Sequence, residues 1–239
     1  MQKNIKIILS VIFVITVLLS SCHKKKDDPT PSSSNNNNGS TSNTGSYLPL
    51  TPGNVWNYDG DDTYTSTVTN KTKTINGKAY SILVDVVQPS STPDSTYAFQ
   101  DGNKYYSYSQ TSAGPLELKI IDLDLPIGTT WSTGISSNAS TDVTYTFKVT
   151  GTGLTRTVNS VAYNDVISVQ LETTTALSPS YIQTLKSYGI DDATIAMMQA
   201  QYAAYDFVQT TYYAKNVGLI EQTSTTSGLN VHLVSSIIK

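Results

Sequence analysis

The chain has few residues that bind metals or form cross-links. Its 239 residues include one cysteine and two histidines. A single cysteine cannot form a disulfide within the chain, and this set leaves too few ligands for a typical zinc site. We therefore expect no disulfide, no bound metal and no cofactor.

Basic residues are also scarce beyond the first 46 positions. Five of the 15 Lys and Arg precede residue 47, as do two of the 18 Asp and Glu, which leaves 10 bases against 16 acids and a net charge near −6. Nucleic-acid binding depends on Lys and Arg that neutralise phosphates. An acidic domain is a poor partner for nucleic acid, so we exclude that class of function.

The motifs of common catalytic classes are missing. The sequence has no Gly-x-Ser-x-Gly and no glycine-rich phosphate loop, and His232 is the one histidine beyond residue 46. A serine hydrolase needs a nucleophile, a base and an orienting group. Asp122 and Asp124 point the same way on a predicted strand, as a glycosidase pair could, but such carboxylates must flank the bond that is cleaved. We therefore predict that the protein is not an enzyme and has no catalytic residue.

The N-terminal apolar run is too short to cross a membrane as a helix. Ile7–Leu19 has 13 residues, whereas a spanning helix needs about 18–20. The run follows Lys3 and Lys6, and a basic start with a short apolar core is typical of a secretory signal peptide. An anchor helix that is never cleaved is the alternative.

The apolar run ends at Leu19-Ser20-Ser21-Cys22, which contains the single cysteine. This pattern resembles the lipobox of bacterial lipoproteins. The resemblance implies that signal peptide 1–21 is removed between Ser21 and Cys22, that the Cys22 thiol carries a diacylglycerol, and that the new amino group is acylated, for example with palmitate. Sulfur is the strongest side-chain nucleophile, which explains the choice of cysteine. Two or three acyl chains hold a protein far more firmly than one. An ordinary secretory signal with a chance cysteine is the alternative.

Residues 23–46 read HKKKDD and then PTPSSSNNNNGSTSNTGS. The second stretch has no apolar side chain to bury, so we expect a disordered tether with a mean span of about 27 Å. The charged run resembles the surface-export signal of Bacteroidota-type lipoproteins, although three bases precede two acids here. His23 also replaces the Asp that commonly signals inner-membrane retention. The resemblance implies the outer membrane, with surface exposure left open, and a plain solvated linker is the alternative reading of the charged run.

From Tyr47 onward, composition and turns predict a mainly β fold. All 16 Tyr lie here with many Ser and Thr, a balance that favours strands with one wet face. Asn76-Gly77 predicts a type I′ turn between residues 72–75 and 78–87, because both central residues need positive φ. We expect about ten strands, as an antiparallel sandwich or a curved half-barrel, in one domain over 47–239.

One stretch between two predicted strands has helical spacing. Ser178-Pro179 is a typical N-cap and first helical residue, and Gly189 can end that helix. The spacing predicts an inserted α-helical hairpin over 179–188 and 192–204. It would serve either as a plug at the open end of the sheet or as a lid over an apolar cavity.

Short signatures in the predicted domain resemble those of uncharacterised secreted lipoproteins of the Bacteroidota type. They are LPLTPGNVWNY, LPIGTTW and NVGLIEQ. The resemblance implies a β-rich domain and no known chemistry. Asp94-Ser95-Thr96 resembles the O-glycosylation motif of such proteins, which makes Ser95 a candidate acceptor.

These features lead us to expect a lipid-anchored outer-membrane protein with a structural or binding role, whose partner is the membrane through Cys22. A glycan-binding surface module is one alternative, since exposed aromatic rings stack on sugars. Its candidate residues are Trp56, Trp131, Tyr105, Tyr106 and Tyr108. A carrier of an apolar ligand, with the helices as a lid, is another alternative and would need an enclosed apolar cavity.

Overall fold

The computed structural model describes residues 45–89, 92–111, 114–137, 140–224 and 230–239. These ranges contain twelve strands and two helices. The strands are β1 (Val55–Gly60), β2 (Thr63–Ile75), β3 (Lys78–Gln88), β4 (Pro93–Asp101), β5 (Lys104–Thr111), β6 (Gly114–Asp122), β7 (Thr130–Ser137), β8 (Thr141–Val158), β9 (Val161–Leu177), β10 (Phe207–Ala214), β11 (Gly218–Ser224) and β12 (Val231–Ile237). The helices are α1 (Pro179–Ser187) and α2 (Asp192–Ala203).

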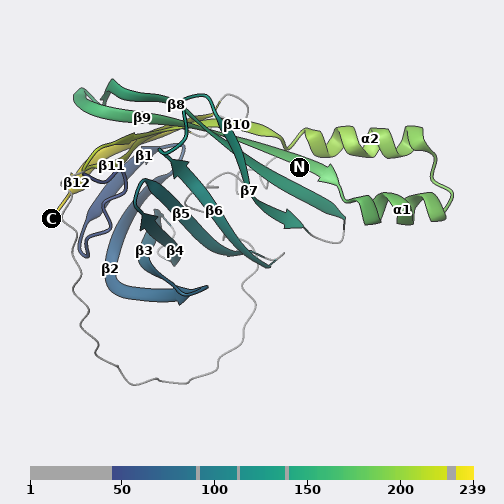
Figure 1. The fold of residues 1–239 in the computed structure, drawn as a ribbon, viewed down its shortest axis with the longest axis horizontal. Helices are drawn as coiled ribbons and strands as arrows, with labels where there is room; N and C mark the ends of the chain where they lie inside the picture. Colours follow the sequence, from purple (N-terminus) through teal and green to yellow (C-terminus); the bar gives the residue numbers. More distant parts are fainter. Residues whose placement is uncertain (1–44, 90–91, 112–113, 138–139, 225–229) are drawn as a thin grey trace, which may run out of the picture.

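All these strands belong to one antiparallel sheet that curls into a nearly closed barrel shape (Figure 1). Strands β1–β6 follow one another as a meander, and so do β7–β12. Pairing of β1 with β12 joins the two meanders, which leaves β6 and β7 as the edge strands of the sheet. The predicted antiparallel half-barrel is confirmed, and the alternative, a two-sheet sandwich, does not form.

The predicted β2–β3 hairpin is confirmed. Asn76 and Gly77 have φ of 50° and 77°, the positive values that a type I′ turn requires and that Asn and Gly tolerate best. The predicted number of strands is too low. β6 begins with Gly114-Pro115 and β7 contains Gly134 among several Ser and Thr, and such residues weaken the sequence signal of a strand.

Alternate residues along the strands point into the barrel and fill it. On β8, Tyr145, Phe147 and Val149 are buried at alternate positions. The rings of Tyr58 on β1 and Tyr64 on the neighbouring strand β2 stack with their centroids 4.7 Å apart. These residues belong to one contiguous core that draws on both meanders, so side chains occupy the inside of the barrel.

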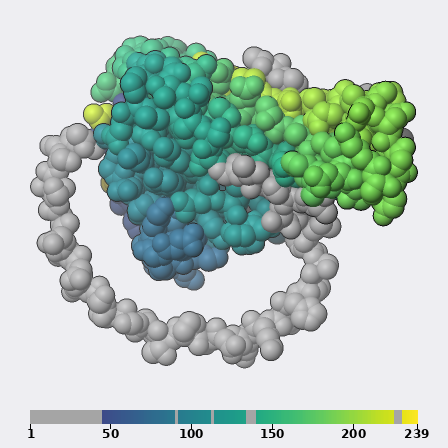
Figure 2. Space-filling model, turned by 45° about the vertical axis from the view of Figure 1, so that its right-hand side comes forward, coloured from purple at the N-terminus to yellow at the C-terminus, as the bar shows by residue number. Residues whose placement is uncertain are grey.

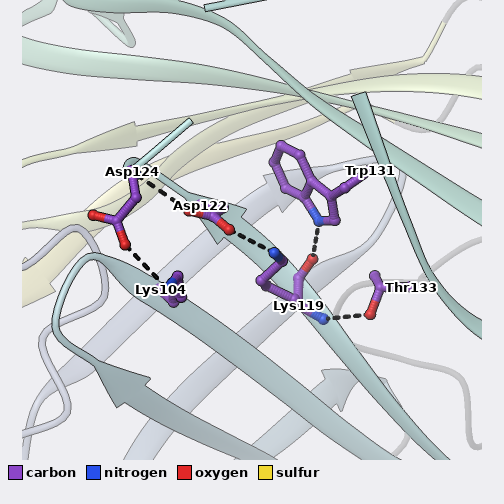
Figure 3. A network of polar contacts seen from close by, with 6 residues as sticks. All are labelled: Lys104, Lys119, Asp122, Asp124, Trp131 and Thr133. Carbon is purple, nitrogen blue, oxygen red and sulfur yellow. Dashed lines mark hydrogen bonds and ion pairs between the residues drawn. The ribbon is translucent and has the colours of Figure 1, made fainter. Parts of the chain in front are cut away.

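Side chains join the two edge strands of the sheet. Trp131 Nε1 on β7 donates to the Lys119 carbonyl oxygen on β6 at 2.8 Å, and the Lys119 amide donates to Thr133 Oγ1 at 3.1 Å (Figure 3). The Trp131 ring stacks on Phe147, with centroids 6.0 Å apart. We call this contact the β6–β7 seam, and it brings the edges together where no backbone ladder is formed between them in the described residues.

Helices α1 and α2 form a helical arm (Pro179–Ala203) that extends away from the sheet (Figures 1 and 2). Ser178 and Asp191 accept hydrogen bonds from backbone amides of the two first turns and cap the helices. Ile195 is the one buried residue of α2, and Gln199 hydrogen-bonds the backbone at the end of β9. The predicted hairpin is confirmed to within one residue, but it stands beside the barrel, where it acts as neither plug nor lid. In the described ranges, no helix has the length and apolar character needed to span a bilayer.

Candidate functional site

A pocket of about 760 Å3 lies where the chain enters the domain. Four separate segments line it: the first described residues, the β4–β5 turn, the residues after β6 and the β10–β11 turn. The lining residues are Gly45, Tyr47, Gln100, Asp101, Gly102, Asn103, Lys104, Tyr105, Leu123, Asp124 and Lys215. Most of them carry hydrogen-bonding groups, so the pocket is a polar one.

One wall of the pocket is the entering chain, which hydrogen bonds attach to the barrel. Ser46 Oγ donates to Gln100 Oε1 at 2.8 Å, and the Ser46 carbonyl accepts from the Asn216 amide at 2.7 Å. The Tyr47 amide and Gln100 Nε2 both donate to the Tyr105 hydroxyl, each at 3.2 Å. This wall is therefore part of the folded domain.

The opposite wall is a network of ion pairs and hydrogen bonds (Figure 3). Lys104 Nζ lies 3.1 Å from Asp124 Oδ2, and Asn103 Nδ2 donates to Asp124 Oδ1 at 3.0 Å. The Asp124 amide donates to Asp122 Oδ1 at 3.1 Å, and Asp122, which is buried, pairs with Lys119. Through Asp122 and Lys119, which lie behind the pocket wall, this network is continuous with the β6–β7 seam.

The charges of the pocket are held in defined states. The hydrogen bond to Asp124 raises the pKa of Lys104, and hydrogen bonds from Asn103 and then Lys104 lower the pKa of Asp124. Burial, with a contribution from the nearby Asp165, raises the pKa of Tyr47. At neutral pH the pocket therefore offers an ammonium group, a carboxylate and a protonated phenol side by side.

This arrangement suits a neutral ligand that is rich in hydroxyl groups. Two lysines and two aspartates balance one another among the lining residues. Amide, carboxylate, ammonium and phenol groups together supply both donors and acceptors, which a hydroxyl group can use at once. Among the residues that the structure describes, no group of three or more His, Cys, Asp or Glu is placed to hold a metal ion.

The aromatic residues predicted to bind glycans do not form one exposed row. Trp56 is 2% exposed, and its Nε1 donates to the Val217 carbonyl at 2.6 Å, so packing occupies this ring. Trp131 is half-buried in the β6–β7 seam. The Tyr105 ring is buried, and only its hydroxyl takes part in the pocket wall. Core packing takes up the Trp56 and Tyr105 rings, and the β6–β7 seam takes up the Trp131 ring, so these three rings form no shared surface platform.

Tyr106 and Tyr108 lie on the other side of the sheet from the barrel interior. They belong to a second, smaller apolar group, which we call the outer aromatic cluster. Its members are Ile75, Tyr80, Tyr97, Phe99, Tyr106 and Tyr108. Tyr80 and Tyr108 are buried, whereas Tyr97, Phe99 and Tyr106 are half-exposed.

The other residues predicted from the sequence lie apart from the pocket or outside the described ranges. Ser21 and Cys22 are outside those ranges. Ser95 is exposed on β4, and its amide donates to Asp94 Oδ1 at 2.7 Å. His232 Nδ1 lies 3.3 Å from Glu221 Oε1 on the neighbouring strand. The paired Asp122 and Asp124 each bind a different lysine, as described above.

Sequence reasoning missed most of the pocket. Tyr47, Gln100, Asn103 and Lys215 come from three distant segments, and none sits in a recognisable motif. The one local signal is Asp101-Gly102-Asn103, a typical turn sequence, which forms the β4–β5 turn and lines part of the pocket.

Comparisons with known proteins identify a solved structure that resembles this chain but no family. No protein-family model matches the chain, and no curated protein matches it. A solved structure resembles it with a TM-score of 0.46 and 13% identity, covering 81% of this chain and 99% of the other. That structure is described as a "putative lipoprotein from Parabacteroides distasonis ATCC 8503", solved at 2.70 Å.

Proposed function

We propose that this protein is a lipid-anchored component of the bacterial outer membrane whose β domain binds a ligand and catalyses no reaction. The anchor is supported by the sequence Leu19-Ser20-Ser21-Cys22, placed after a basic start and a short apolar run. The described domain begins at Gly45, more than 20 residues after Cys22. The segment between Cys22 and Gly45 is long enough to hold the domain clear of the lipid headgroups.

The observation that carries the binding role is the polar pocket. Its volume of about 760 Å3 lies within the usual range of small-ligand sites. Hydrogen bonds and ion pairs within the protein hold both walls in place, so little ordering is needed when a ligand binds. A neutral saccharide offers the dense hydroxyl groups that these walls can pair.

The fold also indicates at which end of the domain the pocket lies. Ser46 is fixed at the β10–β11 turn, beside the start of the β9–β10 pairing at Val166. The helical arm begins after Leu177, at the other end of β9, roughly 35 Å away at the usual rise per strand residue. The pocket therefore shares one end of the molecule with the tether, and the helical arm extends from the other end.

An apolar carrier and an enzyme receive less support from the same observations. Core side chains occupy the barrel interior, and the pocket is lined mainly by polar groups, which does not suit an apolar ligand. Asp122 and Asp124, the carboxylates a glycosidase would use, are each neutralised by a lysine.

The anchor is tested by replacing the cysteine. A Cys22→Ala protein should lose incorporation of labelled fatty acid and should leave the membrane fraction. A Ser32→Ala protein, altered in the tether, should keep both. Fatty-acid label retained by Cys22→Ala would refute the anchor.

The binding role is tested by calorimetric titration of the full-length protein with neutral oligosaccharides such as maltotriose and N,N′,N″-triacetylchitotriose. Asn103→Ala and Lys215→Ala should each weaken binding about tenfold, because each removes a polar group of the pocket. Lys186→Ala, on the helical arm, is the control and should bind like the wild type. The proposed ligand class is refuted if no neutral saccharide binds, or if the pocket variants bind like the wild type.

A further inference from the structure

The outer aromatic cluster presents three half-exposed rings on the outer side of the sheet. Tyr97 pairs with Tyr108 and Phe99 with Tyr106 across the β4–β5 ladder, and the ring centroids of both pairs are 6.0 Å apart. Tyr80 lies beneath them, fully buried, 5.4 Å from the Phe99 ring. The buried rings form a rigid floor, and the half-exposed ones face outward from it.

Two lysines from the β2–β3 hairpin lie over these rings. Lys73 Nζ is 4.7 Å from the centroid of Tyr97, and Lys78 Nζ is 4.5 Å from that of Tyr106. Lys78 also pairs with Glu117 at 2.7 Å. Ammonium groups at these distances are attracted to the ring faces, so each lysine has a defined position beside an aromatic side chain. We call this surface the cationic aromatic face.

Its charge is opposite to that of the rest of the domain. Residues 69–80, which form the tip of the β2–β3 hairpin, contain three lysines and no acid, whereas the chain from residue 47 has a net charge near −6. The hairpin tip forms a lobe at the lower edge of the molecule (Figure 2). Three of the ten bases that follow residue 46 therefore lie on this projecting hairpin, which offers a negatively charged partner a locally attractive surface on an otherwise acidic domain.

We propose that the cationic aromatic face binds an acidic polysaccharide. Lys73 and Lys78 would pair with carboxylate or sulfate groups, while Tyr97, Phe99 and Tyr106 would pack against the apolar faces of the sugar rings. The half-exposed aromatic rings favour a sugar polymer over an acidic peptide, because such rings stack on the apolar faces of sugars. This site is separate from the pocket and does not depend on its ligand.

The test uses the full-length protein in detergent, with polygalacturonate as the acidic probe and dextran as the neutral one. Polygalacturonate should bind at low ionic strength and dissociate in about 0.5 M NaCl, because salt screens exposed charges. The double variant Lys73→Gln/Lys78→Gln should weaken binding about tenfold. Lys186→Gln, a matched loss of one charge on the helical arm, should bind like the wild type.

A second variant separates sugar binding from simple charge attraction. Tyr97→Leu keeps an apolar side chain in the cluster but removes the ring, and it should weaken polygalacturonate binding several-fold. Poly-L-glutamate serves as the peptide probe. The proposal is overturned if the double lysine variant binds like the wild type, if Tyr97→Leu has no effect, or if poly-L-glutamate binds as tightly as polygalacturonate. None of these results bears on the pocket, whose variants are different.

Discussion

Asp85 is a carboxyl group inside the barrel with 1% of its surface exposed. It lies on β3 between Ser66 on β2 and Asp94 on β4, and Thr96 Oγ1 donates to its Oδ2 at 3.2 Å. Burial raises its pKa from 3.8 to about 7, although the Ser66 and Thr96 hydroxyls partly oppose the shift. A protonated acid is less costly to bury than a carboxylate, so the folded protein retains this proton up to near-neutral pH.

This proton makes the stability of the domain depend on pH. Between pH 4 and 7 the folded state holds a proton that the unfolded chain has released, so the free energy of unfolding falls as pH rises, by up to about 4 kcal/mol. Asp85→Asn keeps the size of the side chain and removes the titration. It should be as stable as the wild type near pH 4 and more stable by a few kcal/mol at pH 8.

Urea unfolding of both proteins at the two pH values measures this difference. Asp192→Asn, an exposed carboxylate of the helical arm, is the matched control for the loss of one acid. If the free energies of unfolding of the wild type and Asp85→Asn differ by the same amount at pH 4 and at pH 8, Asp85 carries no proton in the folded state.

At the scale of elements, the β6–β7 seam depends on few groups. Trp131 is the donor of one of its two hydrogen bonds, and Thr133 is the acceptor of the other. The sequence pattern around Trp131 resembled that around Trp56, and both were candidates for an exposed platform. In the structure the Trp131 indole N–H donates to a carbonyl on β6, and the Trp56 indole N–H donates to a carbonyl in the β10–β11 turn.

Trp131→Phe should loosen the seam without unfolding the barrel. The phenyl ring can still stack on Phe147, but the hydrogen bond to Lys119 is lost, which costs about 1 kcal/mol. Hydrogen exchange should therefore become several-fold faster at the β6 and β7 amides than in the wild type, with β9 unchanged.

The matched control for this variant is Trp56→Phe. It loses a comparable hydrogen bond, to Val217, but at a place where backbone ladders hold the sheet. It should not accelerate exchange selectively at the seam. Equal exchange at β6 in Trp131→Phe and in the wild type would mean that the indole does not hold the edges together.

At the scale of the whole molecule, local patterns predicted the elements better than their arrangement. The Asn76-Gly77 turn and the Ser178 cap depend on neighbouring residues, so the sequence shows them directly. The single curled sheet requires β1 to pair with β12, for example Val55 with Ile237, and no local pattern shows this pairing. The pocket was hidden for the same reason, because its walls meet only when the sheet is closed.

The order of the strands also has a consequence for how the chain folds. Within each meander, every ladder joins consecutive strands, so the β1–β12 ladder is the one that must wait for the two ends of the domain to meet. Such non-local pairing is slow, because loop closure costs entropy before contacts form. We expect the two meanders to form early and the β1–β12 ladder to limit the rate.

A circular permutant would reverse this order. Asn54, just before β1, lies beside Lys239, just after β12, since the Lys239 amide donates to Asn54 Oδ1 at 2.9 Å. A linker can therefore join the end of β12 to the start of β1 while the chain is opened between Pro126 and the exposed Ile127. The β1–β12 ladder then becomes a local hairpin, and stopped-flow refolding should be faster than in the natural order. A permutant opened between Asn76 and Gly77 instead makes the β2–β3 ladder non-local and should gain no speed. Equal refolding rates in the two permutants would place the slow step elsewhere, whereas a difference would show that the molecule closes last where its chain begins and ends.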